Sequence, residues 1–105
     1  MQDNNLNLFD EFYPYYLSEH SKSGTKICHF IGTGLAILNS ILFCVDFNFI
    51  YFLLIPISGY GLAWFGHFFF EKNHPATFRY PLYSLQADFL MFWHIIIGKV
   101  KIIKS

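Results

Sequence analysis

The chain has 105 residues, enough for one domain. Hydrophobic residues make up 54% of it and charged residues only 13%, about half the charged share of a typical soluble domain. The formal net charge is zero with histidine neutral, which argues against a nucleic-acid partner. A surface with so little charge is expected to face lipid, and we treat residues 1–105 as a single membrane domain.

The first structured segment is expected at residues 8–17, where apolar and aromatic side chains recur at helical spacing. Asp10, Glu11 and Pro14 interrupt this pattern. It predicts a short amphipathic helix that lies at the membrane interface. A polar segment, residues 18–26, then leads to the apolar part of the chain.

Two uncharged runs follow, over residues 27–45 and 47–70. Each is long enough to cross a bilayer as a helix. The connection between them is too short for anything but a tight hairpin. We therefore predict antiparallel transmembrane helices over about 27–45 and 48–70. A soluble two-helix core is the alternative, but few charged residues remain elsewhere to cover it. Small residues in both runs would let the helices approach closely: Gly32, Gly34, Ala36, Gly59, Gly61, Ala63 and Gly66.

A third apolar stretch covers about residues 84–97 and is short for a membrane span. We expect a helix that is half-inserted or packed against the hairpin. The predicted fold class is therefore all-α, an integral membrane helical hairpin with an amphipathic and a half-inserted helix. All seven Lys and Arg residues lie outside the hairpin turn. By the positive-inside rule, both termini and the histidine end should face the cytoplasm.

Four of the five histidines fall into two pairs at matched distances from the turn. With Phe47 as the centre, His29 lies 18 residues before it and His67 lies 20 after it. These separations are roughly 27 Å and 30 Å along the helices. His20 and His74 each lie 27 residues from the centre, one layer further out. Packing alone does not require this match, so the four histidines are expected to converge at the cytoplasmic mouth.

A carboxylate accompanies these histidines. Glu71 follows His67 by four residues and His74 follows Glu71 by three, so an α-helix would put them on one face. Imidazoles with a nearby carboxylate suit Fe(II), Zn(II) or Cu(II), and ionisable groups inside membrane helices are typical of functional sites. Two alternatives stay open. One is a b-type haem with His29 and His67 as axial ligands; the other is a non-catalytic scaffold whose histidines are interfacial polar groups.

Three segments have a recognisable pattern, Tyr-Leu-Ser-Glu-His at 16–20, His-Phe-Ile-Gly-Thr at 29–33 and Gly-Leu-Ala-Trp-Phe-Gly-His-Phe-Phe-Phe-Glu-Lys-Asn-His-Pro-Ala at 61–76. They resemble the family of the 2-hydroxy-palmitic acid dioxygenase, small multi-pass membrane proteins, over about residues 9–93. The resemblance implies an Fe(II)-dependent enzyme that uses dioxygen to shorten a 2-hydroxy fatty acid by one carbon in α-oxidation. It implies the endoplasmic reticulum membrane in a eukaryote, or the inner membrane in a bacterium.

The resemblance also implies roles for individual residues. His20, His29 and His67 match the family's motif histidines and are expected to bind the metal. Glu71 matches the acidic position, with a catalytic role as ligand or as partner of a ligand. His74 stands where a basic residue, Arg, is expected, and it is a further candidate metal ligand.

A substrate of this class would chelate the iron through its hydroxyl and carboxylate groups. Its acyl tail is expected along an aromatic groove formed by Phe65, Phe68 and Phe69. Basic residues at the mouth are candidate partners of the substrate carboxylate, with plain interfacial anchoring as the alternative: Lys26, Lys72 and Arg79.

Overall fold

The computed structural model describes residues 8–102 of the chain. Four α-helices make up most of this part: α1 (Phe9–Ser18), α2 (Ser23–Asp46), α3 (Phe49–Gly66) and α4 (Pro81–Ile96). Two short helices of other types lie between α3 and α4: the π-helix η1 (His67–Glu71) and the 3-10 helix η2 (Ala76–Phe78). No strand occurs within residues 8–102, so the predicted all-α class is confirmed.

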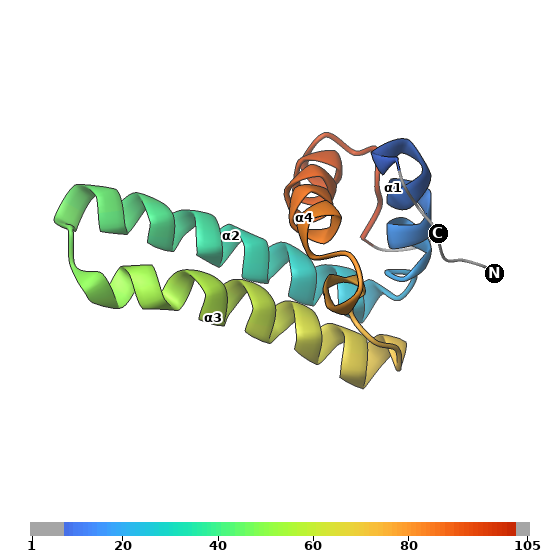
Figure 1. The fold of residues 1–105 in the computed structure, drawn as a ribbon, viewed down its shortest axis with the longest axis horizontal. Helices are drawn as coiled ribbons and strands as arrows, with labels where there is room; N and C mark the ends of the chain where they lie inside the picture. The colour runs from blue at the N-terminus through green and yellow to red at the C-terminus, as the bar shows by residue number, and fades with distance from the viewer. Residues whose placement is uncertain (1–7, 103–105) are drawn as a thin grey trace.

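The longest helices, α2 and α3, lie side by side as an antiparallel hairpin (Figure 1). Phe47 ends α2 in the left-handed conformation, with φ at 55°. Asn48 then begins α3, because its side-chain oxygen accepts a hydrogen bond from the Ile50 backbone N–H at 3.0 Å. Two residues thus make the whole turn, and the predicted tight hairpin is confirmed. Two helices, Ser23–Asp46 and Phe49–Glu71, are long and apolar enough to cross a membrane by length and composition.

Small residues bring the two helix backbones close together. A Cβ atom on Gly32 would lie 3.0 Å from the backbone oxygen of Ser58 and 3.1 Å from that of Gly59. A Cβ on Gly66 would lie 3.1 Å from the Cβ of Cys28. Gly61, in contrast, has no neighbour within 4 Å of such an atom. Gly32 and Gly66 therefore set the close approach that the small-residue pattern predicted, whereas Gly61 does not contribute to it.

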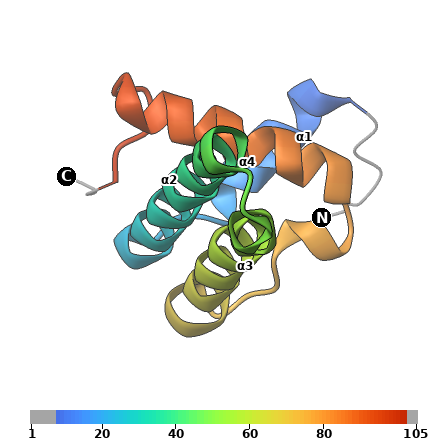
Figure 2. The ribbon, with the colours of Figure 1, turned by 90° about the vertical axis from the view of Figure 1, so that its left-hand side faces the viewer.

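The helices α1 and α4 cover only the open end of the hairpin. In Figure 2, α4 crosses over the hairpin rather than running along it. A buried core joins α1 to α4 and η2, formed by Phe12, Tyr16, Ala76, Ala87 and Met91. The third helix predicted over 84–97 is α4, and it packs against the hairpin. It begins three residues earlier than predicted, because Pro81 occupies its first turn.

The rest of the hairpin extends away from α1 and α4 (Figure 1). Many of its apolar side chains are largely exposed: Val45 is 79% exposed, Phe49 61% and Ile57 63%. Large apolar surfaces of this kind mark contact with a membrane or another protein. A helix pairs most of its backbone hydrogen-bonding groups internally, which is the condition for contact with lipid.

Gly32 offers a direct test of the hairpin packing. In Gly32→Ala the new methyl group meets backbone atoms that cannot move aside, so the free energy of unfolding should fall by about 1–3 kcal/mol. The measurement is unfolding of the detergent-solubilised protein followed by circular dichroism. Gly61→Ala is the matched control, since the added methyl group meets nothing and a helical alanine is up to about 1 kcal/mol better than glycine. Equal effects of the two substitutions would contradict the packing.

Candidate metal centre

Three buried histidines meet at the open end of the hairpin. His20 comes from the turn between α1 and α2, His29 from the first turns of α2, and His67 from the start of η1. One ligand nitrogen from each lies within 4.8 Å of the other two. The ring of His20 lies between the other two, at centroid distances of 4.8 Å from His29 and 4.4 Å from His67. These are the three histidines predicted to bind a metal, and they can hold a metal ion.

His20 reaches the cluster because the chain folds back after α1. Its backbone N–H donates to Leu17 O at 3.0 Å, which turns the chain toward the hairpin. The distances along the chain predicted that His20 and His74 form an outer layer. This prediction is wrong, because His20 lies in the cluster with His29 and His67. His74 is exposed, and its ring lies near those of Phe68 and Phe78, with centroids 6.1 Å and 6.5 Å away. The helix η1 ends at Glu71, three residues before His74, so no helical register carries His74 to the site.

Hydrogen bonds fix which nitrogen of two imidazoles carries the proton. His20 Nδ1 donates to the backbone oxygen of Tyr16 at 2.6 Å, and a carbonyl can only accept. His67 Nδ1 donates to the side-chain oxygen of Asn73 at 2.8 Å. The orientation of that amide is set by its own NH₂ group, which donates to Glu19 O and Oε1 at 3.2 Å and 3.1 Å. Both neutral imidazoles therefore have their lone pair on Nε2.

These two Nε2 atoms face each other at 3.0 Å. Two lone pairs at that distance repel unless a cation lies between or beside them. A shared proton is disfavoured, because burial and the neighbouring imidazoles of His29 and His67 hold the pKa of His20 well below its ordinary value. A metal ion removes the repulsion and needs neutral imidazoles, with the outer nitrogens held as metal-binding histidines usually have them. The donor set fits a metal.

The third histidine is connected to a carboxylate on α4. His29 Nε2 lies 3.1 Å from Asp88 Oδ1 and 3.1 Å from the Tyr16 hydroxyl oxygen. The Tyr16 hydroxyl donates to the same Asp88 oxygen at 2.6 Å. Burial, and then the charge of Asp88, raise the pKa of Tyr16 well above its ordinary value, so it remains a donor. Sequence reasoning did not single out Asp88, although it is the one acidic residue within 84–97.

Glu71 ends η1, and its carboxylate lies at the start of α2 rather than in the group of three histidines. Its carboxylate accepts hydrogen bonds from the backbone N–H groups of Ser21 and Lys22, each at 3.0 Å. It also accepts from the Ser21 hydroxyl and from Thr25 Oγ1, the latter at 2.7 Å. The expectation that Glu71 shares an α-helical face with His67 needs correction, because this segment is π-helical and its turn is wider. A catalytic role for Glu71 stays a prediction.

The basic residues proposed for the substrate carboxylate lie elsewhere. Lys26 Nζ donates to the backbone oxygen of Lys101 at 2.9 Å. The guanidinium carbon of Arg79 lies 5.7 Å from the centre of the Tyr80 ring, and Lys72 is exposed. No Lys or Arg residue is among the described residues that line the small cavity at the three histidines.

A small cavity lies at the histidines, and a larger cavity shares two of its lining residues. The smaller, of about 10 Å³, has the three histidines, Trp64, Ser84 and Asp88 in its wall. The larger, of about 250 Å³, lies between α2, α3 and α4, and most of its wall is apolar: Thr33, Ala36, Ile55, Pro56, Gly59, Tyr60, Leu85, Asp88 and Phe89. Tyr60 and Asp88 line both cavities, which makes the two spaces neighbours. The residues of the expected aromatic groove are roughly half exposed and line neither cavity: Phe65, Phe68 and Phe69.

The family described as 2-hydroxy-palmitic acid dioxygenase Mpo1-like matches residues 6–100. The chain belongs to this family. No curated protein and no solved structure matches the chain. The three histidines and Asp88 lie within the matched range, and the family name points to a dioxygenase of 2-hydroxy fatty acids.

Removal of any one of the three histidines should empty the centre. His20→Ala, His29→Ala and His67→Ala are each expected to lose most bound metal, because a site with three imidazoles cannot spare one. The measurement is metal content by elemental analysis of the purified variants. His94→Ala should retain its metal, since His94 Nδ1 pairs with the Tyr13 hydroxyl at 2.7 Å outside the cluster. Equal metal loss in His94→Ala would contradict the assignment.

Glu71→Gln should act through the fold. Glutamine is uncharged, and one end of its amide donates instead of accepting, so it cannot replace the four hydrogen bonds that the carboxylate accepts. The free energy of unfolding should therefore fall by about 1–3 kcal/mol. Metal affinity should fall by about 10–100-fold, because Ser21 and Lys22 directly follow His20. The number of metal ions bound at saturation should not change. Glu11→Gln, at an exposed position of α1, is the matched control. A lower stoichiometry in Glu71→Gln would instead make Glu71 a ligand.

Proposed function

We propose that the protein is an Fe(II)-dependent dioxygenase that shortens 2-hydroxy fatty acids by one carbon at a membrane. One observation carries the proposal. The Nε2 atoms of His20 and His67 lie 3.0 Å apart, buried beside His29, with their lone pairs facing each other. The chain that holds them belongs to the Mpo1-like family. Three imidazoles with a carboxylate nearby suit Fe(II), whose role when bound is to bind and activate dioxygen. His20, His29 and His67 would hold it.

The larger cavity suits the acyl chain of the substrate. Its wall is largely apolar, and it adjoins the histidine cavity at Tyr60 and Asp88. A fatty acid whose chain lies there would present its C1 and C2 atoms at the histidines. This cavity replaces the aromatic groove expected on the outer face of α3 as the site of the tail.

Asp88 is suited to take up the proton of the substrate hydroxyl. Asp88 lines both cavities. The carboxylate oxygen that accepts a hydrogen bond from Tyr16 also lies 3.1 Å from His29 Nε2. The raised pKa of Tyr16 keeps the phenol protonated, so it can position Asp88 but does not compete for the proton. One dioxygen balances the reaction when the C1–C2 bond breaks to give the shortened acid, carbon dioxide and water.

The hairpin supports a location in a membrane. Its two helices are long and apolar enough to span, and their outer side chains have no protein cover within residues 8–102. With all Lys and Arg residues outside the turn, we infer that the histidine end and the termini face the cytoplasm. The membrane would be the inner membrane in a bacterium or the endoplasmic reticulum in a eukaryote. Lipid, fatty acid and dioxygen are then the partners.

The b-type haem alternative fits the site less well. The rings of His29 and His67 lie 6.3 Å apart, and the ring of His20 lies within 5 Å of each. A porphyrin between two axial histidines would need the space that His20 fills. A scaffold without a metal leaves the facing lone pairs unexplained.

Oxygen consumption tests the proposed activity. The purified protein with Fe(II) should consume dioxygen when 2-hydroxyhexadecanoic acid is added and release the acid with one carbon fewer, identified by mass spectrometry. A chelator should abolish the activity, and Fe(II) should restore it where Zn(II) does not, because only iron can exchange electrons with dioxygen. His67→Ala is the inactive control. A haem-type visible spectrum, or a protein that binds no iron, would overturn the proposal.

A further inference from the structure

Two buried polar atoms in the wall of the histidine cavity have no hydrogen-bond partner within residues 8–102. They are Trp64 Nε1 and Ser84 Oγ. Ser84 is only 1% exposed, so solvent does not supply the missing partner. Buried polar groups of proteins are almost always hydrogen-bonded, and each exception needs an explanation. A ligand atom in this cavity would provide one.

Both residues stand one helical turn from a residue of the centre. Trp64, on α3, precedes His67 by three residues, and the backbone of His67 continues the helical conformation. Ser84 precedes Asp88 by four residues on α4, so each shares a helix face with its neighbour at the site. Two different helices thus each contribute a residue with an unsatisfied polar atom to the wall of the same small space. The coincidence favours a common ligand over two unrelated packing defects.

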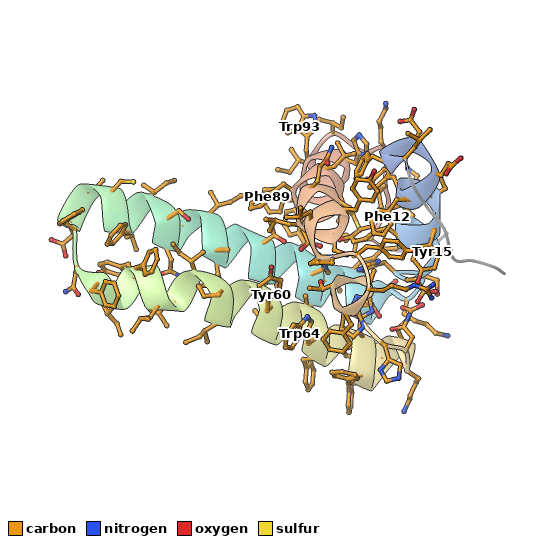
Figure 3. The ribbon with its side chains drawn as sticks, in the orientation of Figure 1. Phe12, Tyr15, Tyr60, Trp64, Phe89 and Trp93 are labelled. Carbon is orange, nitrogen blue, oxygen red and sulfur yellow. The ribbon has the colours of Figure 1, made fainter. Side chains whose placement is uncertain are left out.

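Ring contacts hold the indole of Trp64 in place. It stacks on Tyr60 with a centroid distance of 5.4 Å and meets Phe78 edge-on at 5.3 Å. Figure 3 shows Tyr60 and Trp64 on α3, at the part of the hairpin nearest α4. An indole N–H can only donate a hydrogen bond, whereas a serine hydroxyl can donate or accept. The ligand atom must therefore be an acceptor, such as an oxygen.

We propose that Trp64 and Ser84 bind the carboxylate of the 2-hydroxy acid, the role that the sequence suggested for Lys26, Lys72 and Arg79. This inference rests on the proposed function. The cavity of about 10 Å³ has room for one small group such as a carboxylate oxygen, and the chain cavity adjoins it. The oxygen satisfies the indole N–H and the hydroxyl together.

The charge balance agrees with uncharged donors at this position. A divalent cation on three neutral imidazoles offsets two negative charges, the carboxylate of Asp88 and that of the substrate. A lysine or arginine in the same cavity would leave a surplus positive charge, and no lysine or arginine among residues 8–102 lines it. The neutral donors orient the carboxylate, and the metal neutralises it.

Conservative substitutions test the assignment. Trp64→Phe keeps an aromatic ring and removes the N–H, and Ser84→Ala removes the hydroxyl. Each should keep full iron content and raise KM for 2-hydroxyhexadecanoic acid about tenfold, the usual scale for one hydrogen bond to a charged group. Trp93→Phe and Ser40→Ala are matched controls, because Trp93 is exposed on α4 and Ser40 bonds its own helix at Ala36. If a water molecule fills the cavity instead, KM will not change, and the inference fails.

A second measurement does not depend on activity. In Trp93→Phe, Trp64 is the sole tryptophan of the chain, and its fluorescence reports directly on the cavity. Titration with 2-hydroxyhexadecanoic acid should give a saturable change that hexadecan-1-ol, which lacks the carboxylate, does not give. A saturable change without turnover would reject the proposed reaction and keep this binding site. Turnover with no change in Trp64 fluorescence would reject the site and keep the reaction.

Discussion

The Nε2 atoms of His20 and His67 lie 3.0 Å apart, each with a lone pair directed at the other. Neither ring can turn away at low cost, because Tyr16 O holds one and Asn73 holds the other. Burial also disfavours the proton that would relieve the repulsion. The surrounding helices therefore hold two bases in a position that is favourable only with a cation. The fold around them can be understood as the means of maintaining that position.

The hairpin supplies two of the three histidines through its register alone. A two-residue turn fixes how far α2 and α3 run past each other, and glycine contacts fix their separation. His29 and His67 meet for that reason, and counting residues from Phe47 was enough to predict it. The long apolar runs likewise identified both helices, because length and hydropathy are properties of the sequence itself.

The remaining features of the site depend on tertiary contacts that residue spacing does not contain. His20 enters because α1 folds back, whereas counting paired it with His74. The prediction that His67 and Glu71 share a helical face assumed α-helical spacing, but this segment forms the π-helix η1. Asp88 reaches His29 only because α4 crosses the hairpin (Figure 2). A lone carboxylate in an apolar helix is a signal that sequence reasoning can use, but the partner it finds is decided by packing.

The two carboxylates of this region differ in what surrounds them, and that difference separates their roles. Glu71 meets backbone N–H groups at the start of α2, where a negative charge is stabilised by the helix dipole. Four donors already occupy its oxygens. Asp88 accepts one strong hydrogen bond, from Tyr16, and lies beside His29 at the junction of the cavities. We therefore propose that Asp88, which has unused acceptor capacity, is the carboxylate that faces the substrate, and that Glu71 holds the helices in place.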